Sequence, residues 1–190
     1  MSTLPLWYPW PETETKPAPM PLLLVQAFVN TVDTERGQDL LDDATTARTW
    51  LTDAGMLDPN AALTPADLKQ ATAVREGIRE LLARTDPPLS LAPLRGLAAS
   101  RSAQLTIGDG GQVGLEAPGA AEITDGLFRL LLIIHRAQED GTWSRLRVCA
   151  NDECRWAFYD RSRNQHGSWC DMATCGNRLK NRELRARKRR

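Results

Sequence analysis

The stretch CANDECRWAFYDRSRNQHGSWCDMATCGNR, from Cys149 to Arg178, decides the fold of the C-terminal part of the chain. It holds every cysteine of the 190-residue sequence, as two C-x4-C pairs separated by fifteen residues: Cys149 and Cys154, then Cys170 and Cys175. Cysteine thiolates are preferred ligands of structural zinc, and two such pairs can complete one tetrahedron. A segment this short buries too little apolar surface to fold alone, so a metal would supply the missing free energy. The spacing therefore predicts one structural Zn²⁺ held by these four cysteines.

The same cysteines allow two other arrangements. Two disulfides would use all four residues, but the sequence opens without the basic and apolar regions of a secretion signal, so we expect reduced thiols. His166 lies between the pairs and could replace a cysteine as ligand. Because four thiolates already fill the coordination shell, we expect His166 to face solvent or phosphate. A filled shell also predicts a structural site rather than a catalytic one.

Formal charge is divided unevenly along the chain. The 24 basic and 24 acidic residues cancel overall, but residues 143–190 hold 13 basic and 5 acidic residues, a net charge of +8. The preceding 142 residues therefore carry −8. Such asymmetry points to a nucleic acid, or another anionic surface, as the partner of the basic end.

The basic residues gather on a predicted C-terminal helix that begins at Met172, with Asp171 as its N-cap. Arginines at 178, 182, 185 and 189 are spaced by four, three and four, so they share one face of that helix. With their neighbours and the loop before them, the predicted nucleic-acid-binding residues are Arg161, Arg163, Arg178, Lys180, Arg182, Arg185, Arg187, Lys188 and Arg189. A stripe of this kind neutralises phosphates, and its affinity should fall steeply with salt. For Arg178, an ion pair with a carboxylate such as Asp160 is an equal alternative.

The fold class predicted for the whole chain is α+β: a mostly helical N-terminal domain with one β-hairpin, followed by a small treble-clef-like zinc finger. Thr64-Pro65-Ala66-Asp67 is a strong helix start, with an N-cap hydroxyl, a proline and a carboxylate in the first turn. Glycines around Asp109, flanked by alternating apolar residues, predict a hairpin near 104–116. Helices are expected over 22–32, 45–54, 64–84, 90–102 and 121–139, and finger strands over 143–148 and 155–159.

Several features outside the finger are less specific. The proline-rich segment 1–21 cannot be helical, and its aromatic residues favour an extended arm docked in part on the body. The apolar run Leu130–Ile134 is too short to span a bilayer, so no membrane association is expected. Asp39, Asp42 and Asp43 are interpreted as a solvated helix entrance rather than a cation site, and His135 as a structural or capping residue. A small-molecule pocket would lie among the long helices and the hairpin, but the sequence does not locate it.

Two segments resemble known families. Cys175-Gly176-Asn177-Arg178 is the tetrapeptide that names the CGNR zinc-finger family, and the stretch quoted above is similar to that finger throughout. FVNTVDTERGQDLLDDATTARTWLTDAGML, which begins at Phe28, resembles the opening of the ABATE domain. Where family members often carry an aspartate before FVNT, this sequence has Gln26-Ala27. The resemblance implies an ABATE-like domain at 22–142 and a CGNR finger at 143–190, while the arm at 1–21 has no obvious counterpart in the family. It also implies a bacterial, stress-responsive transcriptional regulator whose finger binds DNA.

We therefore expect a cytoplasmic, nucleoid-associated DNA-binding regulator with one structural Zn²⁺. Its acidic domain would sense a signal or form a homodimer. One alternative is an RNA-binding factor that stacks bases on Trp143, Trp156 or Trp169. Another is a structural, protein-interaction module built on the same finger. An enzyme is not expected, because the sequence brings no base, nucleophile and open metal together.

Overall fold

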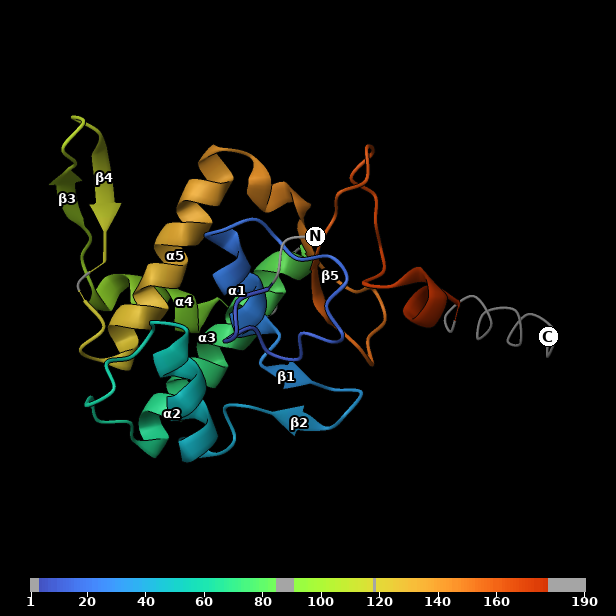
Figure 1. Cartoon of the computed structure of the whole chain (residues 1–190), viewed down its shortest axis with the longest axis horizontal. Coiled ribbons are helices and arrows are strands. Elements are labelled where there is room, and N and C mark those ends of the chain that lie inside the picture. The colour runs from blue at the N-terminus through green and yellow to red at the C-terminus, as the bar shows by residue number, and fades with distance from the viewer. Residues whose placement is uncertain (1–3, 85–90, 118, 178–190) are drawn as a thin grey trace.

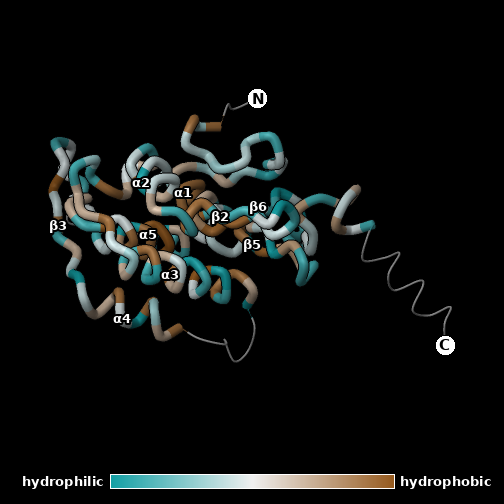
Figure 2. The backbone as a smooth tube through the Cα atoms, turned by 90° about the horizontal axis from the view of Figure 1, so that it is seen from below, coloured by the Kyte–Doolittle hydropathy of each residue, from teal (hydrophilic) through white to brown (hydrophobic). Residues whose placement is uncertain are grey.

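Helix α1 (Leu22–Val29) lies at the centre of the fold. The structure is a computed structural model that describes residues 4–84, 91–117 and 119–177. All eight residues of α1 are buried, including Gln26, and the helix packs against α3 (Pro65–Ala83) and α5 (Ile123–Glu139). Figure 2 shows the most hydrophobic segments gathered where these helices meet. A helix that is apolar on every side is expected to be buried on every side, and α1 confirms that expectation.

The other elements surround this centre. Helices α2 (Ala44–Asp53) and α4 (Ala92–Ser100) pack against α3. The strands form three antiparallel pairs: β1 (Val32–Asp33) with β2 (Gln38–Asp39), β3 (Gln104–Ile107) with β4 (Val113–Glu116), and β5 (Leu146–Val148) with β6 (Ala157–Tyr159). The β3–β4 hairpin and the β5–β6 region lie at opposite ends of the molecule (Figure 1). The α+β class predicted from the sequence is confirmed.

Local start signals decide where the long helices begin. Thr64 and Asp67 form a reciprocal capping box at the start of α3, as the sequence predicts. A second capping box, between Glu122 and Asp125, opens α5. Arg101 pairs with both of those carboxylates, at 2.8 Å from Asp125, and so ties the end of α4 to the start of α5. The predicted helix bounds are met to within two residues for α2, α3, α4 and α5.

Two predicted boundaries are wrong. The first helix ends at Val29 rather than Val32, because the Asn30 side chain bonds to the finger and Val32 pairs with Asp39 in β1–β2. The expected strand 143–148 begins only at Leu146. Residues Thr142–Arg145 form a 3₁₀ turn (η1), since Gly141 adopts a φ of 79° and the Asp140 carboxylate accepts a hydrogen bond from the Thr142 amide.

The predicted hairpin at 104–116 is confirmed, but its apolar face is not covered. Leu105 faces Leu115 and Ile107 faces Val113 across the pair. Leu105, Ile107 and Val113 are 73%, 77% and 68% exposed. The alternating pattern therefore identifies the strands correctly without identifying a face that is buried in the described residues.

The proline-rich arm is docked, as its aromatic residues predict. Tyr8 is buried, and the backbone oxygen of Trp7 accepts a hydrogen bond from the Trp50 indole at 2.8 Å. The Trp10 indole donates to the backbone oxygen of Asn30 at 3.1 Å. These contacts lay the arm across α1 and α2.

The acidic stretch before α2 is explained by protein contacts. The Arg75 guanidinium donates two hydrogen bonds, of 2.6 and 2.7 Å, to the Asp39 carboxylate. The Asp43 carboxylate caps α2 by accepting from the Thr46 amide. His135 is half exposed and lies 3.7 Å from Glu139, one turn further along α5. In the parts of the chain that the structure describes, no helix is both long enough and apolar enough to cross a membrane.

Candidate metal centre

The first cysteine pair lies on the loop that joins β5 to β6. Cys149 follows β5 directly, and its amide donates to the backbone oxygen of Trp156 at 2.9 Å, which closes the loop. The Cys154 amide donates to the backbone oxygen of Asn151 at 2.9 Å. Arg155 then adopts a left-handed conformation, with a φ of 51°, and redirects the chain into β6. This tight turn points both thiols to the same side.

The second pair lies at a helical turn, η2 (Met172–Gly176). The Asp171 carboxylate caps that turn by accepting from the Thr174 amide at 2.9 Å, as the sequence predicts. Cys170 comes just before the cap, and Cys175 lies on the turn itself. Gly176 is close-packed, since a Cβ there would lie 2.5 Å from the Met172 sulfur. The remainder of the predicted C-terminal helix, from residue 178, lies outside the described residues.

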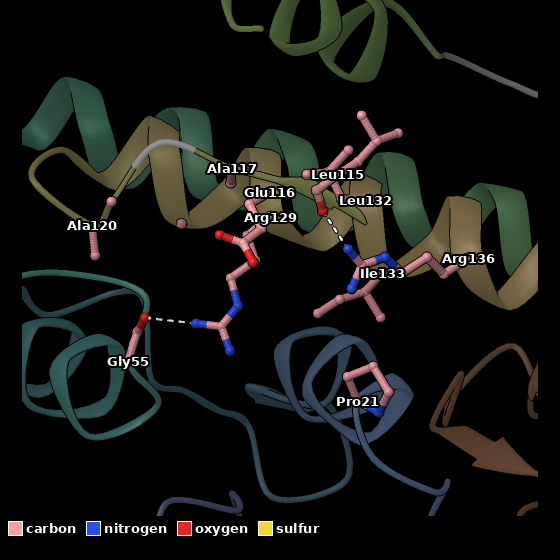
Figure 3. A pocket seen from close by; sticks show the side chains of 12 residues that line it. Pro21, Gly55, Leu115, Glu116, Ala117, Ala120, Arg129, Leu132, Ile133 and Arg136 are labelled. Atoms are coloured by element: carbon pink, nitrogen blue, oxygen red, sulfur yellow. Dashed lines mark hydrogen bonds between the residues drawn. The ribbon is translucent and has the colours of Figure 1, made fainter. Parts of the chain in front are cut away.

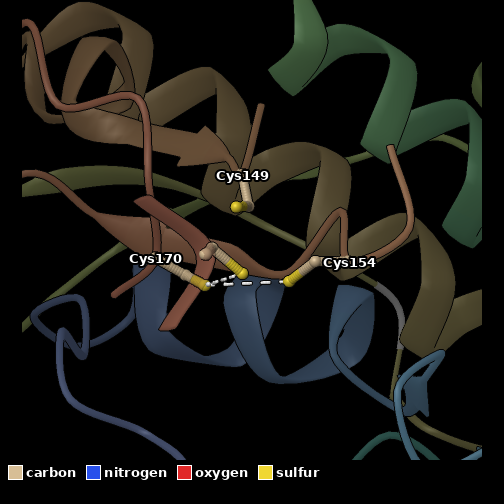
Figure 4. Close-up of side chains that lie close together, drawn as sticks. Cys149, Cys154 and Cys170 are labelled. Atoms are coloured by element: carbon tan, nitrogen blue, oxygen red, sulfur yellow. Dashed lines mark hydrogen bonds between the residues drawn. The ribbon is translucent and has the colours of Figure 1, made fainter. Parts of the chain in front are cut away.

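The four sulfur atoms converge on one point. All of them lie within 4.8 Å of one another, and the Cys154–Cys170 and Cys170–Cys175 Sγ distances are both 3.7 Å. Figure 4 shows Cys149, Cys154 and Cys170 directed at a common centre. Four sulfurs at about 2.3 Å from one zinc ion stand about 3.8 Å apart in a tetrahedron, so the arrangement fits that ion. None of the four thiols is in a disulfide.

Cys149, Cys154 and Cys175 are buried, while Cys170 is partly exposed. A cavity of about 220 Å³ between the arm and η2 reaches Cys154, Cys170 and Cys175, which gives an ion a route to the sulfurs. Around the cluster, the Asn151 side-chain amide lies 3.8 Å from the Cys175 sulfur, in position to donate to a thiolate. His166 is exposed in the loop after β6 and is not among the groups that the structure brings together.

Hydrogen bonds inside the cluster separate the pKa values of the thiols. Donation from Cys154, and then from Cys170, lowers the pKa of Cys149 from its ordinary value of 9.0 to about 2. The same hydrogen bonds raise the pKa of Cys154 and that of Cys170. One thiolate thus forms at the expense of its neighbours. A divalent cation would remove this conflict, because it stabilises negative charge on all four sulfurs.

Asn30 holds β6, and with it the loop that carries the first cysteine pair, against the helical body. Its side-chain oxygen accepts from the Ala157 amide at 2.8 Å, and its side-chain nitrogen donates to the Ala157 oxygen at 2.9 Å. Gln26, one turn earlier on α1, donates to the same oxygen at 3.2 Å. Both side chains are fully buried. Gln26 of α1 and Asn30, which caps the end of α1, therefore bond to the backbone of β6 as an adjacent strand would.

Helix α3 holds the other side of the loop. The Arg79 guanidinium donates to the backbone oxygen of Arg155 at 3.0 Å and to that of Val29 at 2.7 Å. Arg155 in turn pairs with Glu80 at 2.8 Å. Because Arg79 is buried, these contacts form inside the protein, where unpaired groups are costly. They fix the position of the first cysteine pair relative to α1 and α3.

The arm completes the junction through Glu14 and Lys16. The Glu14 carboxylate accepts hydrogen bonds from Tyr8, Gln26 and the Trp156 indole. Burial raises the pKa of Glu14, although these hydrogen bonds lower it in part. Lys16 donates to the backbone oxygen of Trp169 at 2.7 Å and lies over the Phe158 ring. The arm thus contacts both the β6 strand and the segment that precedes Cys170.

Replacing Asn30 by alanine is expected to destabilise the protein by about 2 kcal/mol. The Ala157 amide would lose its partner in a buried position, which costs about 1–3 kcal/mol. Urea unfolding followed by tryptophan fluorescence measures the change, with the exposed Asn60→Ala as the matched control. An unfolding midpoint equal to that of the control would contradict this account of the junction.

The structure places two of the nine predicted nucleic-acid-binding residues. Arg161 and Arg163 are exposed on the loop after β6, and Arg161 donates to the backbone oxygen of Pro17 and lies over the Tyr159 ring. The other seven, Arg178, Lys180, Arg182, Arg185, Arg187, Lys188 and Arg189, lie outside the described residues. The Asp160 carboxylate, considered as a partner of Arg178, accepts from the amides of Ser162 and Gly167.

Sequence reasoning missed the residues that orient the finger. Asn30, Gln26 and Arg79 act on partners far away in the chain, and nothing local distinguishes them from ordinary helix residues. The available signal was polarity: Gln26 and Asn30 interrupt the apolar run LLLVQAFVNTV, and a polar residue in a buried helix needs a partner.

Two family models match the chain. Residues 23–147 match ABATE, described as "Putative stress-induced transcription regulator", and residues 145–188 match the model described as "CGNR zinc finger". Together they cover the helical body and the cysteine cluster, in that order. The curated proteins include no match to the chain.

Proposed function

The chain belongs to the ABATE family and carries a C-terminal CGNR zinc finger, and from this premise we propose that it is a zinc-dependent, DNA-binding transcriptional regulator acting in a stress response. The finger and the basic segment after it would contact DNA. The acidic helical body would sense a signal or form a dimer, in a cytoplasmic, nucleoid-associated protein.

Cys149, Cys154, Cys170 and Cys175 would hold one structural zinc ion. The ion would connect the β5–β6 loop, which supplies Cys149 and Cys154, to the segment Cys170–Gly176, which supplies Cys170 and Cys175. Four protein ligands leave no coordination position for water or substrate, so the proposal assigns no catalytic role to the centre. The family descriptions name a regulator and a zinc finger, and neither describes an enzyme.

The observation that carries the proposal is that the sulfur cluster directly precedes a basic segment, residues 178–190, in the sequence. Cys175 lies on the turn that leads, after Asn177, into a sequence with eight of the chain's 24 basic residues in its last thirteen positions. A metal that fixes this turn would also fix the point of the chain from which the basic segment continues. Arginine clusters neutralise phosphates and release counterions, which favours a nucleic acid as the partner.

DNA is favoured over single-stranded RNA by the position of Trp156. An RNA site of the kind considered for this sequence needs exposed aromatic rings on which bases stack. Trp156 is only 8% exposed, and its indole is bonded to Glu14. Trp143 and Trp169 are partly buried. The loop after β6 instead exposes Arg161 and Arg163, among other polar residues, and these two suit phosphate contacts.

The double charge reversal Arg182→Glu, Arg185→Glu is expected to reduce affinity for duplex DNA at least tenfold near 0.1 M salt. Losing two phosphate contacts should also reduce the slope of log K against log salt by about 2. Fluorescence anisotropy with labelled duplex DNA of mixed sequence measures both quantities. The zinc content should stay unchanged.

The matched control is Lys69→Glu, Arg95→Glu, which makes the same charge change on exposed positions of α3 and α4. It should bind DNA much as the parent does. Equal affinity of the two double variants for DNA, or stronger binding of single-stranded RNA by the parent, would overturn the proposal. A zinc-dependent oligomer without any salt-sensitive binding would favour a protein-interaction module instead.

A further inference from the structure

A pocket of about 440 Å³ opens between α5, the end of β4 and the loop after α2 (Figure 3), and no residue of the cysteine cluster lines it. Leu115, Leu132 and Ile133 form apolar walls. The small side chains of Ala117 and Ala120 also line the pocket. Pockets of this size hold molecules of metabolite or drug size. An apolar interior favours a ligand with a hydrocarbon or aromatic body.

Two arginines of α5, Arg129 and Arg136, line this pocket. They are seven residues apart, so they lie on one face of the helix, two turns from each other. The Arg129 guanidinium donates to the backbone oxygen of Gly55 at 3.0 Å, and that of Arg136 donates to the backbone oxygen of Leu115. Figure 3 shows both side chains held in this way beside the cavity. Each guanidinium has five N–H donors, so one bond to a carbonyl leaves others available.

The positive charges of both arginines are unpaired in the part of the chain that the structure describes. Within residues 4–84, 91–117 and 119–177, no carboxylate forms an ion pair with Arg129 or Arg136. The structure forms such pairs elsewhere on the body, as with Arg75 and Asp39. Glu116 also lines the pocket, so its charged lining totals +1. The lining therefore offers an apolar interior with an excess of cationic donors.

We propose that this pocket binds a small organic carboxylate. The carboxylate group accepts from the guanidinium groups of Arg129 and Arg136, and the apolar body of the ligand packs against Leu115, Leu132 and Ile133. Arginine suits this task because its planar fork of donors matches a carboxylate. An inorganic phosphate would use the donors but leave the apolar walls in contact with water. The proposal concerns the helical body, and it stands whether or not the finger binds nucleic acid.

The test uses 2-naphthoate as the probe and the uncharged 2-naphthylmethanol as its comparison. About a dozen non-hydrogen atoms at about 0.3 kcal/mol each give the full-length protein a dissociation constant on the order of a millimolar for naphthoate. Ligand-observed NMR titration measures affinities in this range. Naphthoate should bind about tenfold more tightly than the alcohol, because charged hydrogen bonds contribute about 1.5–3 kcal/mol before screening at an exposed site.

Three variants separate the site from general attraction. The double change Arg129→Gln, Arg136→Gln should weaken naphthoate binding about tenfold and leave the alcohol unchanged. Arg48→Gln, Arg95→Gln is the matched control, because it removes two positive charges from positions outside the pocket. Glu116→Gln should tighten naphthoate binding about two- to fivefold, since it removes a like charge. Glu116 is exposed at the end of β4, so its neutral replacement leaves the fold intact.

Each outcome decides the matter. Tighter binding by Glu116→Gln, together with weaker binding by the arginine variant, supports the site even if the arginine variant is less stable. Naphthoate binding that equals the binding of the alcohol, binding that Glu116→Gln does not tighten, or no binding to the parent protein up to about ten times the expected dissociation constant, would overturn it.

Discussion

The substitution Cys175→Ser is expected to weaken zinc binding about a hundredfold and to abolish the ordered finger. Structural zinc contributes about 10–16 kcal/mol in zinc-finger peptides, which is about 3 kcal/mol for each of four ligands. Cys175 is the most buried of the four, at 1% exposed, so no other side chain can easily take its place. The loss should appear in competition with a colorimetric chelator and in the fluorescence of Trp156 and Trp169.

The control for this experiment is His166→Ala. His166 is the histidine closest in sequence to the cysteines, but it is exposed and outside the cluster. Its replacement should leave both the zinc affinity and the fluorescence unchanged. If Cys175→Ser kept the parent affinity while His166→Ala lost it, histidine rather than cysteine would be the fourth ligand.

The substitution Gly126→Ala is expected to lower the free energy of unfolding by about 3 kcal/mol or more. Gly126 lies on the buried face of α5, where an added Cβ would stand 2.0 Å from the backbone oxygen of Met56. A backbone carbonyl cannot rotate away as a side chain can, so α5 or the segment around Met56 would have to move. Overpacking of this kind typically costs about 1–3 kcal/mol, and more when the backbone must shift.

Gly96 provides the matched control for this glycine. It also lies inside a helix, α4, but nothing lies within 4 Å of where its Cβ would be. Alanine has the higher helix propensity, so Gly96→Ala should stabilise the protein by up to about 1 kcal/mol. Urea unfolding compares the two variants. Equal effects would show that α5 does not depend on close contact at Gly126.

Local signals in the sequence predicted much of this structure. Thr64 and Asp67 determine where α3 begins through contacts three residues apart, so a short motif suffices. The hairpin at 104–116 depends on its own glycines, and the four cysteines are found by their spacing alone. The ABATE and CGNR resemblances are confirmed by the family matches. The division into an arm, a helical domain and a finger at residues 21 and 142 stays a prediction.

What the sequence did not predict depends on contacts between distant residues. Asn30 and Ala157 are separated by 127 positions, and the hydrogen bonds between them anchor the finger to the end of α1. Gln26 and Arg79 were missed for the same reason. The pocket was expected among the helices and the hairpin, but locating it requires knowing that Arg129 and Arg136 face the end of β4. The strand predicted from residue 143 was too long because the Gly141 conformation and the Asp140 contact were not recognised.

Native mass spectrometry of the intact protein, purified under reducing conditions without added metal, tests the central claim most directly. The account predicts one dominant species with the mass of the chain plus a single zinc ion, less the protons that the thiolates release. Acid or a strong chelator should convert it to the bare chain. A dominant metal-free species, or one whose mass shows cysteines oxidised to disulfides, would contradict it.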